Sequence, residues 1–401
     1  MRDQQKLSPY QVFLTFLKLG LTSFGGPVAH LGYFRSEFVE RRRCMNDSTY
    51  ADLVALCQFL PGPASSQVGI GIGISQAGLR GGVAAWCGFT LPSAVALILL
   101  AYGITALDAS VVHSGWLHGL KVVAVAVVAQ AIWGMARALC PDVSRRLMAI
   151  LAAITTMILT GVYGQLAAIT AGALLGLIFL RYEGQATHEP EMFNPGRTMA
   201  VCSLGLFCVL LLFLPLLARS GIHAFDLIDS FYRTGSLVFG GGHVVLPLLQ
   251  AEVVNQGWVS KDLFLAGYGA AQAVPGPLFT FSAYLGAAQQ LFPNGWAGGV
   301  LCLMAIFLPS FLLVVGILPF WEALRKNHRV RSALLGVNAA VVGLLIAAFY
   351  DPVWSSGILS MGDLVLALAA FGLLTLGKVP AWAVVGATGL AAALVGHLGT
   401  F

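Results

Sequence analysis

Two basic side chains stand inside strongly apolar stretches of the chain, at Lys18 and Arg233. Each comes six residues before a Phe-Gly-Gly run, which begins at Phe24 or at Phe239. An ionisable residue within a membrane segment is costly and indicates a functional site by default. We therefore expect both cations to bind an oxyanion directly. The alternative is that each side chain extends to the nearer membrane surface.

Hydroxyl groups follow a second kind of break, the Pro-Gly-Pro sequences at 61–63 and 275–277. Proline interrupts a helix, and the helix that restarts after it presents unpaired N–H groups and the positive end of its dipole. Ser65, Ser66 and Thr280 add O–H donors in these first turns. Such a set of donors suits a small anion rich in oxygen. The alternative is a proline-kinked helix without a ligand.

The predicted site combines both kinds of break. The substrate-binding candidates are Lys18, Gly25, Gly26, Ser65, Ser66, Arg233, Gly240, Gly241 and Thr280. The prolines expected to break helices are Pro27, Pro61, Pro63, Pro275 and Pro277. The candidates for coupling or gating are His30, Arg35, Glu37, His243 and Glu252. The two glutamates could pair with the basic residues or carry protons; the alternative is that they are interfacial charges. The two histidines could titrate near neutral pH; the alternative is that each is buried and hydrogen-bonded.

The elements that must position these residues are membrane helices. Of the 401 residues, 58% are hydrophobic and only 10% are charged, whereas a soluble protein carries about 25% charged residues. The composition therefore predicts an all-α polytopic protein of the lipid bilayer. The net charge of +5 fits basic cytoplasmic loops and does not indicate nucleic acid binding. The seven cysteines form no Cys-x-x-Cys pair, so we expect no metal and no cofactor.

The chain contains an internal repeat. Glu37 and Gln58 of the first half match Glu252 and Gln272 of the second, in the same order as the breaks. Leu-Pro-Ser at 91–93 likewise recurs later, at 308–310. We expect a first repeat at 1–181, a linker with one extra transmembrane helix at 182–221, and a second repeat at 222–401. Repeats with Gly/Pro-interrupted segments at corresponding positions are typical of secondary transporters.

The two halves are expected to have opposite orientations, because their basic residues alternate. The loop at 35–47 holds four arginines, but its counterpart at 250–262 holds only Lys261. The loop at 105–116 holds no Lys or Arg, but its counterpart at 322–333 is strongly basic. Cytoplasmic loops are enriched in Lys and Arg. We therefore predict inverted-topology repeats with re-entrant helical hairpins, 10–42 and 49–78 entering from the cytoplasm, and a cytoplasmic N-terminus.

Three stretches carry a resemblance to a known family. The run from Phe24 to Arg43, Phe-Gly-Gly-Pro-Val-Ala-His-Leu-Gly-Tyr-Phe-Arg-Ser-Glu-Phe-Val-Glu-Arg-Arg-Arg, resembles the signature of the chromate ion transporter (CHR) family in its two-domain form. So do Cys-Gln-Phe-Leu-Pro-Gly-Pro at 57–63 and Phe-Gly-Gly-Gly-His at 239–243. The resemblance implies a bacterial inner-membrane protein that exports chromate, confers chromate resistance, and uses protons or a counter-anion.

Other functions remain open at this stage. Sulfate resembles chromate in shape and charge, so a general sulfate-like oxyanion carrier is the main alternative, and a passive anion channel is another. A chromate-reducing enzyme would need an electron source, and neither paired cysteines nor a nucleotide fingerprint is present. We therefore expect a transporter rather than an enzyme. The resemblance also allows a homodimer.

Overall fold

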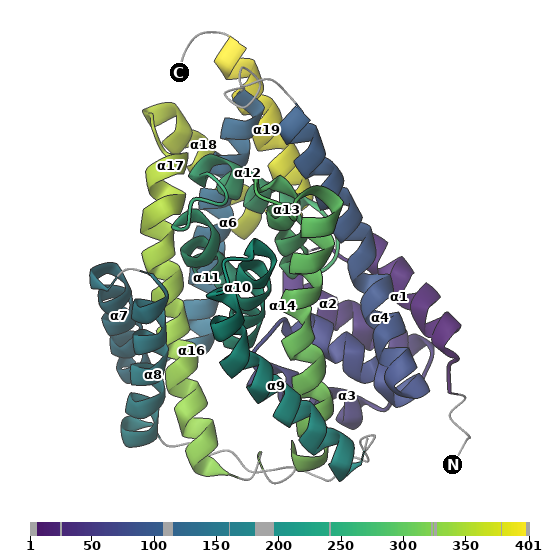
Figure 1. Ribbon diagram of the computed structural model, residues 1–401. Coiled ribbons are helices and arrows are strands. Elements are labelled where there is room, and N and C mark those ends of the chain that lie inside the picture. The colour runs from purple at the N-terminus through teal and green to yellow at the C-terminus, as the bar shows by residue number, and fades with distance from the viewer. Residues whose placement is uncertain are drawn as a thin grey trace.

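The computed structural model describes residues 6–24, 26–106, 115–159, 161–180, 196–239, 242–321, 324, 327–377 and 379–397. In these ranges every regular element is helical (Figure 1). Five of the described helices are long and apolar enough to cross a membrane, and they lie at Ala64–Thr105, His118–Leu139, Arg197–Ala218, Gly295–Phe320 and His328–Gly357. The chain is therefore an all-α polytopic membrane protein, as its composition predicts.

The first half opens with short helices separated by breaks. They are α1 (Pro9–Thr22), α2 (Gly26–Arg35), its π-helical continuation η1 (Ser36–Arg41) and α3 (Asp47–Phe59). Ser8 and Asn46 cap α1 and α3 by accepting backbone N–H groups, as short polar residues do at helix starts. Each helix is shorter than the roughly 20 residues that a crossing needs. The predicted breaks between these helices are thus confirmed, and their re-entrant course in the membrane stays a prediction.

Helix α4 (Ala64–Ala106) folds back on itself. Ala77 and Gly78 leave the helical conformation, with φ of +64° at Gly78. Beyond them Gly82 packs against Ile70 and Ile74. In a straight helix residues 70 and 82 would be about 18 Å apart. Two helices therefore meet at this turn, and the first of them ends where the predicted hairpin 49–78 ends.

The second half repeats the pattern. Its short elements are α10 (His223–Leu237), η2 (Gly242–Val244), α11 (Val245–Leu249), the π-helical η3 (Gln250–Val254), α12 (Lys261–Ala273), η4 (Leu278–Thr280) and α13 (Phe281–Ala288). The long helix α14 (Gly295–Ile317) and the 3-10 turn η5 (Leu318–Phe320) follow. The π-helices η1 and η3 occupy equivalent positions and carry the equivalent residues Glu37 and Glu252.

The packing of α14 on α4 shows that the halves are inverted. Tyr102 accepts the backbone N–H of Trp296 at 3.1 Å, and Gly299 packs on Ile98. Farther along, Phe307 meets Trp86 with ring centroids 5.6 Å apart. Numbers rise on one helix as they fall on the other, so α14 runs antiparallel to its own repeat equivalent. This arrangement is the one that the distribution of basic residues predicts.

The two halves exchange their last helices. Helices α7 (Val143–Ile158) and α8 (Val162–Phe179) pack on α16 (His328–Ala348) of the second half. Helices α18 (Met361–Thr375) and α19 (Ala381–His397) pack on α6 (Gly115–Leu139) of the first. Figure 1 shows α7 and α8 beside α16. Small residues bring membrane helices close, and Gly172 and Gly176 accordingly face Gly336.

The remaining described elements are α9, η6 and α17. Helix α9 (Arg197–Ala218) is the predicted extra helix, and it packs on α10 and α14. Only 11% of its most apolar window is buried, so most of its surface faces outward. The π-helical η6 (Phe349–Trp354) and the short α17 (Ser355–Gly357) connect α16 to α18. The first part of the expected linker, residues 182–195, lies outside the described residues.

Candidate substrate cavity

The Pro-Gly-Pro segment of each half is hydrogen-bonded to the Phe-Gly-Gly segment of the other. Gly62 donates its backbone N–H to the carbonyl of Val238 at 2.6 Å, and Gly276 donates to the carbonyl of Ser23 at 3.1 Å. Val238 and Ser23 directly precede Phe239 and Phe24. The sequence predicts four separate breaks. These reciprocal bonds bring the four breaks together between the halves, at a place that we call the crossing.

Both central glycines are in conformations that favour glycine. The φ angle is +122° at Gly62 and +103° at Gly276, a region that other L-residues enter only at a cost. A Cβ atom added at Gly62 would lie 2.7 Å from Oγ of Ser310, and one at Gly276 would lie 2.9 Å from Oγ of Ser93. The crossing therefore leaves no room for a side chain at either position.

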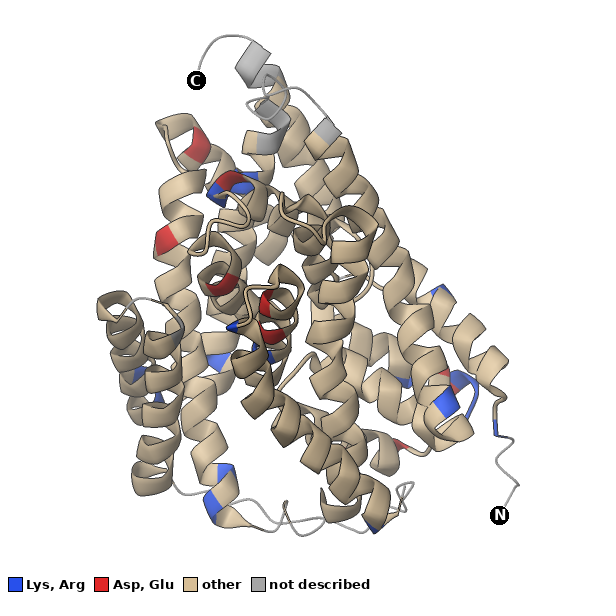
Figure 2. Cartoon of the chain, in the orientation of Figure 1, with Lys and Arg blue, Asp and Glu red and all other residues tan. Residues whose placement is uncertain are grey.

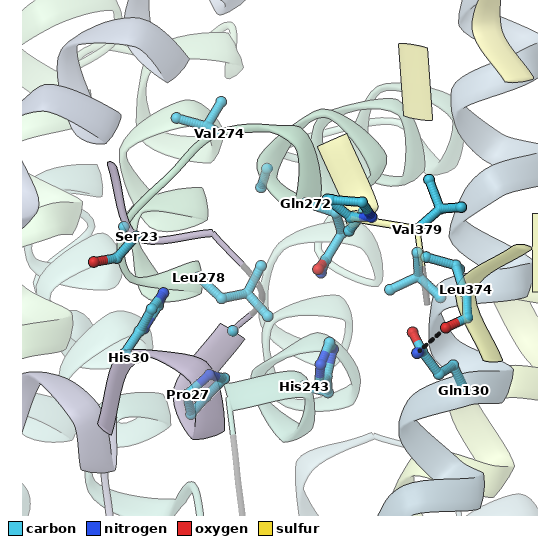
Figure 3. Close-up of a pocket in the computed structure, with 16 residues that line it drawn as sticks. Ser23, Pro27, His30, Gln130, His243, Gln272, Val274, Leu278, Leu374 and Val379 are labelled. Atoms are coloured by element: carbon cyan, nitrogen blue, oxygen red, sulfur yellow. Dashed lines mark hydrogen bonds between the residues drawn. The ribbon is translucent and has the colours of Figure 1, made fainter. Parts of the chain in front are cut away.

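A cavity of about 310 Å³ lies beside this crossing. Figure 3 shows residues of both halves around it. Its polar lining residues are Ser23, His30, Gln130, His243 and Gln272. The other lining side chains are apolar, and no Lys, Arg, Asp or Glu is among the described residues that line it. Irregular backbone at membrane depth is tolerated where it borders such a cavity.

Three of the polar groups make no hydrogen bond of good geometry with the described residues. They are Oγ of Ser23, Nε2 of His30 and Nε2 of Gln272. Nδ1 of His30 lies 3.3 Å from Oγ of Ser65, and if Ser65 donates to Nδ1, the neutral ring carries its proton on Nε2. The Ser23 carbonyl lies near the ring and already accepts a hydrogen bond from the backbone N–H of Gly276 at 3.1 Å. Buried polar groups normally have partners, so the three indicate a ligand that accepts hydrogen bonds.

Two further polar groups hold the cavity wall in place. Nδ1 of His243 lies 2.8 Å from Oη of Tyr268. Gln130 donates from Nε2 to the carbonyl of Leu374 at 3.2 Å, the dashed line in Figure 3. The second bond joins α6 to the end of α18, so both halves contribute to the wall.

The residues predicted to bind substrate, to gate or to break helices fall into four groups. Gly26, Pro27, His30 and His243 line the cavity. Ser65, Ser66 and Thr280 are buried behind it: Ser65 contacts His30, Oγ of Ser66 is unpartnered, and Thr280 donates to the carbonyl of Pro277 at 2.7 Å. Gly25, Gly240 and Gly241 lie outside the described residues. The predicted breaks at Pro61, Pro63, Pro275 and Pro277 form the crossing loops.

Lys18 and Arg233 are not brought together. Lys18 is exposed on α1, away from the cavity. Arg233 binds Asp229 at 2.7 Å and Glu252 at 3.3 Å, also outside the cavity. The environment of Lys18 thus fits a side chain that extends to a membrane surface, and Arg233 is already neutralised by carboxylates. The direct-ligand role expected of both finds no support in this geometry.

These environments predict different outcomes for the two alanine variants. Lys18→Ala is expected to keep its stability within about 0.5 kcal/mol, as exposed sites do. Arg233→Ala leaves two buried carboxylates without their cation and is expected to cost about 3–5 kcal/mol. Thermal unfolding of the purified variants in detergent measures both. Equal stability of the two variants would contradict the assignment.

Arg35 and Glu37 belong to a network of ion pairs around η1. Arg35 binds Asp47 at 2.9 Å and also contacts Glu40. Glu37 accepts from Arg41 at 2.9 Å and from Arg42 at 2.6 Å. Hydrogen bonds from Arg35 lower the pKa of Asp47. Neither Arg35 nor Glu37 reaches the cavity, and Glu37 does not pair with Lys18.

Sequence reasoning did not select Ser23, Gln130 or Gln272 as site residues. Gln272 carried a usable signal, because it has a repeat equivalent in Gln58. Ser23 directly precedes the first Phe-Gly-Gly run. Gln130 has no such signal, since it lies within an uninterrupted apolar helix.

The sequence of the chain resembles those of known proteins. The sequence model of the family described as Chromate transporter matches the chain twice, over residues 10–177 and 225–396. The chain belongs to the chromate transporter family. The two matches cover both inverted halves, and they confirm the resemblance carried by the Phe-Gly-Gly and Pro-Gly-Pro motifs.

Named members of the chromate transporter family align over most of the chain. A chromate transport protein of Pseudomonas aeruginosa is 27% identical over 345 residues, which is 85% of this chain and 80% of that protein. A probable chromate transport protein of Synechococcus elongatus is 26% identical, over 83% and 81%. A chromate transport protein of Cupriavidus metallidurans is 24% identical, over 84% and 81%. No solved structure matches the chain.

Proposed function

We propose that this protein is a secondary transporter that exports chromate from the cytoplasm across the bacterial inner membrane and so confers chromate resistance. The observation that carries the proposal is the cavity at the crossing of the two inverted halves, which is lined by three residues with a buried, unpaired polar atom, Ser23, His30 and Gln272. Membership of the chromate transporter family supports chromate as the substrate. Repeats of opposite orientation around a central site are the arrangement expected for alternating access.

Chromate would bind here through neutral donors. Its four oxygens accept hydrogen bonds from Ser23, His30 and Gln272, and bonds to a charged group contribute about 1.5–3 kcal/mol each. No fixed cation lines the cavity among the described residues, so binding stays moderate. Moderate binding suits a carrier, because a tightly held dianion would be released slowly.

The membrane potential supports the direction of transport. Moving one charge across 100 mV changes the free energy by about 2.3 kcal/mol, so a dianion leaving a negative interior gains roughly twice that. In Figure 2 most of the Lys and Arg positions lie in the lower half of the molecule. The enrichment of Lys and Arg in cytoplasmic loops supports a cytoplasmic position for that part of the molecule and for the N-terminus.

Uptake of labelled chromate into inside-out membrane vesicles tests the proposal. We expect saturable uptake that requires a respiratory substrate and is only weakly inhibited by excess sulfate, because uptake into such vesicles corresponds to export from cells. Vesicles without the protein are the control. Uptake that sulfate suppresses at an equimolar concentration would instead indicate a general oxyanion carrier, and uptake that never saturates would indicate a channel.

A further inference from the structure

A buried ionic cluster lies apart from the cavity, at Asp229, Arg233 and Glu252. One guanidinium nitrogen, Nη2 of Arg233, lies 2.7 Å from Asp229 and 3.3 Å from Glu252. The two carboxylate side chains are only 8% and 7% exposed. Figure 2 shows acidic residues at mid-height, on α10 and on the segment beside it. Ionisable residues at such a depth are expensive and usually functional.

The charges of this cluster do not balance. Two carboxylates face one guanidinium, which leaves one negative charge in excess when both are ionised. Asp226, one turn earlier on α10, has its own partner in His223 at 3.6 Å. Two buried carboxylates that share a site cannot both ionise easily. A bound cation or proton would restore neutrality.

The elements packed around the cluster supply no second cation. Helices α8, α11 and α14 carry no charged residue, and α9 has only Arg197, at its first position. Helix α12 has Lys261 and Asp262 at its start. These two residues are bound elsewhere, to Asp351 at 3.0 Å and to Lys121 at 2.9 Å. The excess charge therefore has to be neutralised within the cluster.

Gln165 of α8 provides an independent observation. It is 5% exposed, and it donates from Nε2 to the carbonyl of Pro247 at 2.8 Å. Its Oε1 atom has no donor among the described residues. Gln165, Arg233 and Glu252 enclose a common space that is too small for a water molecule. The missing partner is thus a hydrogen-bond donor, which a protonated carboxyl group of the cluster can supply.

The cluster is present in one half only. The repeat equivalents of Asp229, Arg233 and Glu252 are Leu14, Lys18 and Glu37. Leu14 and Lys18 are exposed, and Glu37 pairs with arginines of its own segment. Because the first half folds without such a cluster, the repeat architecture does not require it. This asymmetry favours a functional role.

Two continuous segments of the chain carry residues of the cluster and also reach the cavity or the crossing. Glu252 and the cavity residue His243 lie on one continuous segment, 242–254. Helix α10, which carries Asp229 and Arg233, leads directly to Val238 at the crossing. We propose that Asp229 and Glu252 share the proton that is exchanged for chromate, with Gln165 accepting a hydrogen bond from the protonated form. This inference rests on the proposed function.

Transport assays in proteoliposomes with the purified full-length chain distinguish a loss of coupling to protons from a loss of substrate binding. Glu252→Gln and Asp229→Asn are measured for chromate accumulation driven by a pH gradient and for chromate–chromate counterflow. We expect accumulation to fall at least tenfold in Glu252→Gln while counterflow stays within twofold of wild type. Glu40→Gln, an exposed carboxylate with an arginine partner, is the control and should keep both activities.

A second readout does not depend on transport. The infrared band of a protonated carboxylic acid should titrate in the wild-type protein and be lost in Glu252→Gln. The inference would be overturned if both variants kept accumulation driven by a pH gradient, or if they lost accumulation and counterflow together. It would also be overturned if a sodium gradient alone drove accumulation by the wild type. If the wild type moves no chromate, the proposed function fails, and the infrared band alone decides whether the cluster holds a proton.

Discussion

Gly276→Ala is expected to destabilise the protein by about 2–5 kcal/mol. About 1–2 kcal/mol comes from a positive φ in a residue with a Cβ atom. Crowding of a packed site adds about 1–3 kcal/mol, because the new atom would lie 2.9 Å from Oγ of Ser93. The same effect is expected for Gly62→Ala at the equivalent loop. Chromate transport should fall with stability, since these loops join the two halves.

Two other glycines provide controls for this prediction. Gly103 and Gly372 lie within helices, with no atom close to the position of an added Cβ. Alanine at either site should be neutral or slightly stabilising, because alanine is the better helix former. Thermal unfolding of the detergent-solubilised variants measures the difference. A Gly276→Ala protein as stable as Gly103→Ala would show that the halves do not cross as described.

Gln272→Ala is expected to reduce chromate uptake at least tenfold while the protein remains folded. Gln272 lines the cavity, and its buried Nε2 atom makes no hydrogen bond of good geometry with the described residues. A hydrogen bond to a charged ligand contributes about 1.5–3 kcal/mol, and each 1.4 kcal/mol corresponds to about a factor of ten. His30→Ala should act in the same direction by removing the Nε2 donor. Initial rates in inside-out vesicles measure both.

The repeat supplies the control for this experiment. Gln58 is the sequence equivalent of Gln272, but its side chain is exposed and outside the cavity. Gln58→Ala should therefore keep uptake within about twofold of wild type, as surface substitutions usually do. Equal losses in the two variants, or none in Gln272→Ala, would argue that chromate does not bind at this cavity.

Local signals in the sequence predicted much of the fold. The breaks follow from Pro and Gly at 61–63 and 275–277, because proline cannot continue a helix. The inversion follows from the distribution of Lys and Arg among the loops, because cytoplasmic loops are enriched in these residues. The exchange of helix pairs was not predictable in this way. Gly172 and Gly336 each indicate close packing, but a single small residue does not say which helix will approach it.

The candidate site was predicted less well, because equivalent residues have different surroundings. Lys18 and Arg233 correspond in sequence, yet only Arg233 has an acidic residue one turn earlier, at Asp229. That difference leaves one cation exposed and the other in a buried ionic cluster. The cavity instead presents uncharged donors, and a residue such as Gln130, within an uninterrupted apolar helix, has no sequence pattern that marks it as part of the site.

The exchanged helices have a consequence for the order in which the chain is made. Helix α8 ends at Phe179, but α16, on which it packs, begins only at His328. At typical synthesis rates of about 5–20 residues per second, α7 and α8 wait roughly 10–30 s in the membrane before that partner emerges. Their glycine-lined face is meanwhile open to lipid or to another nascent chain. Assembly of the first half is therefore completed only after α16 of the second half has been made.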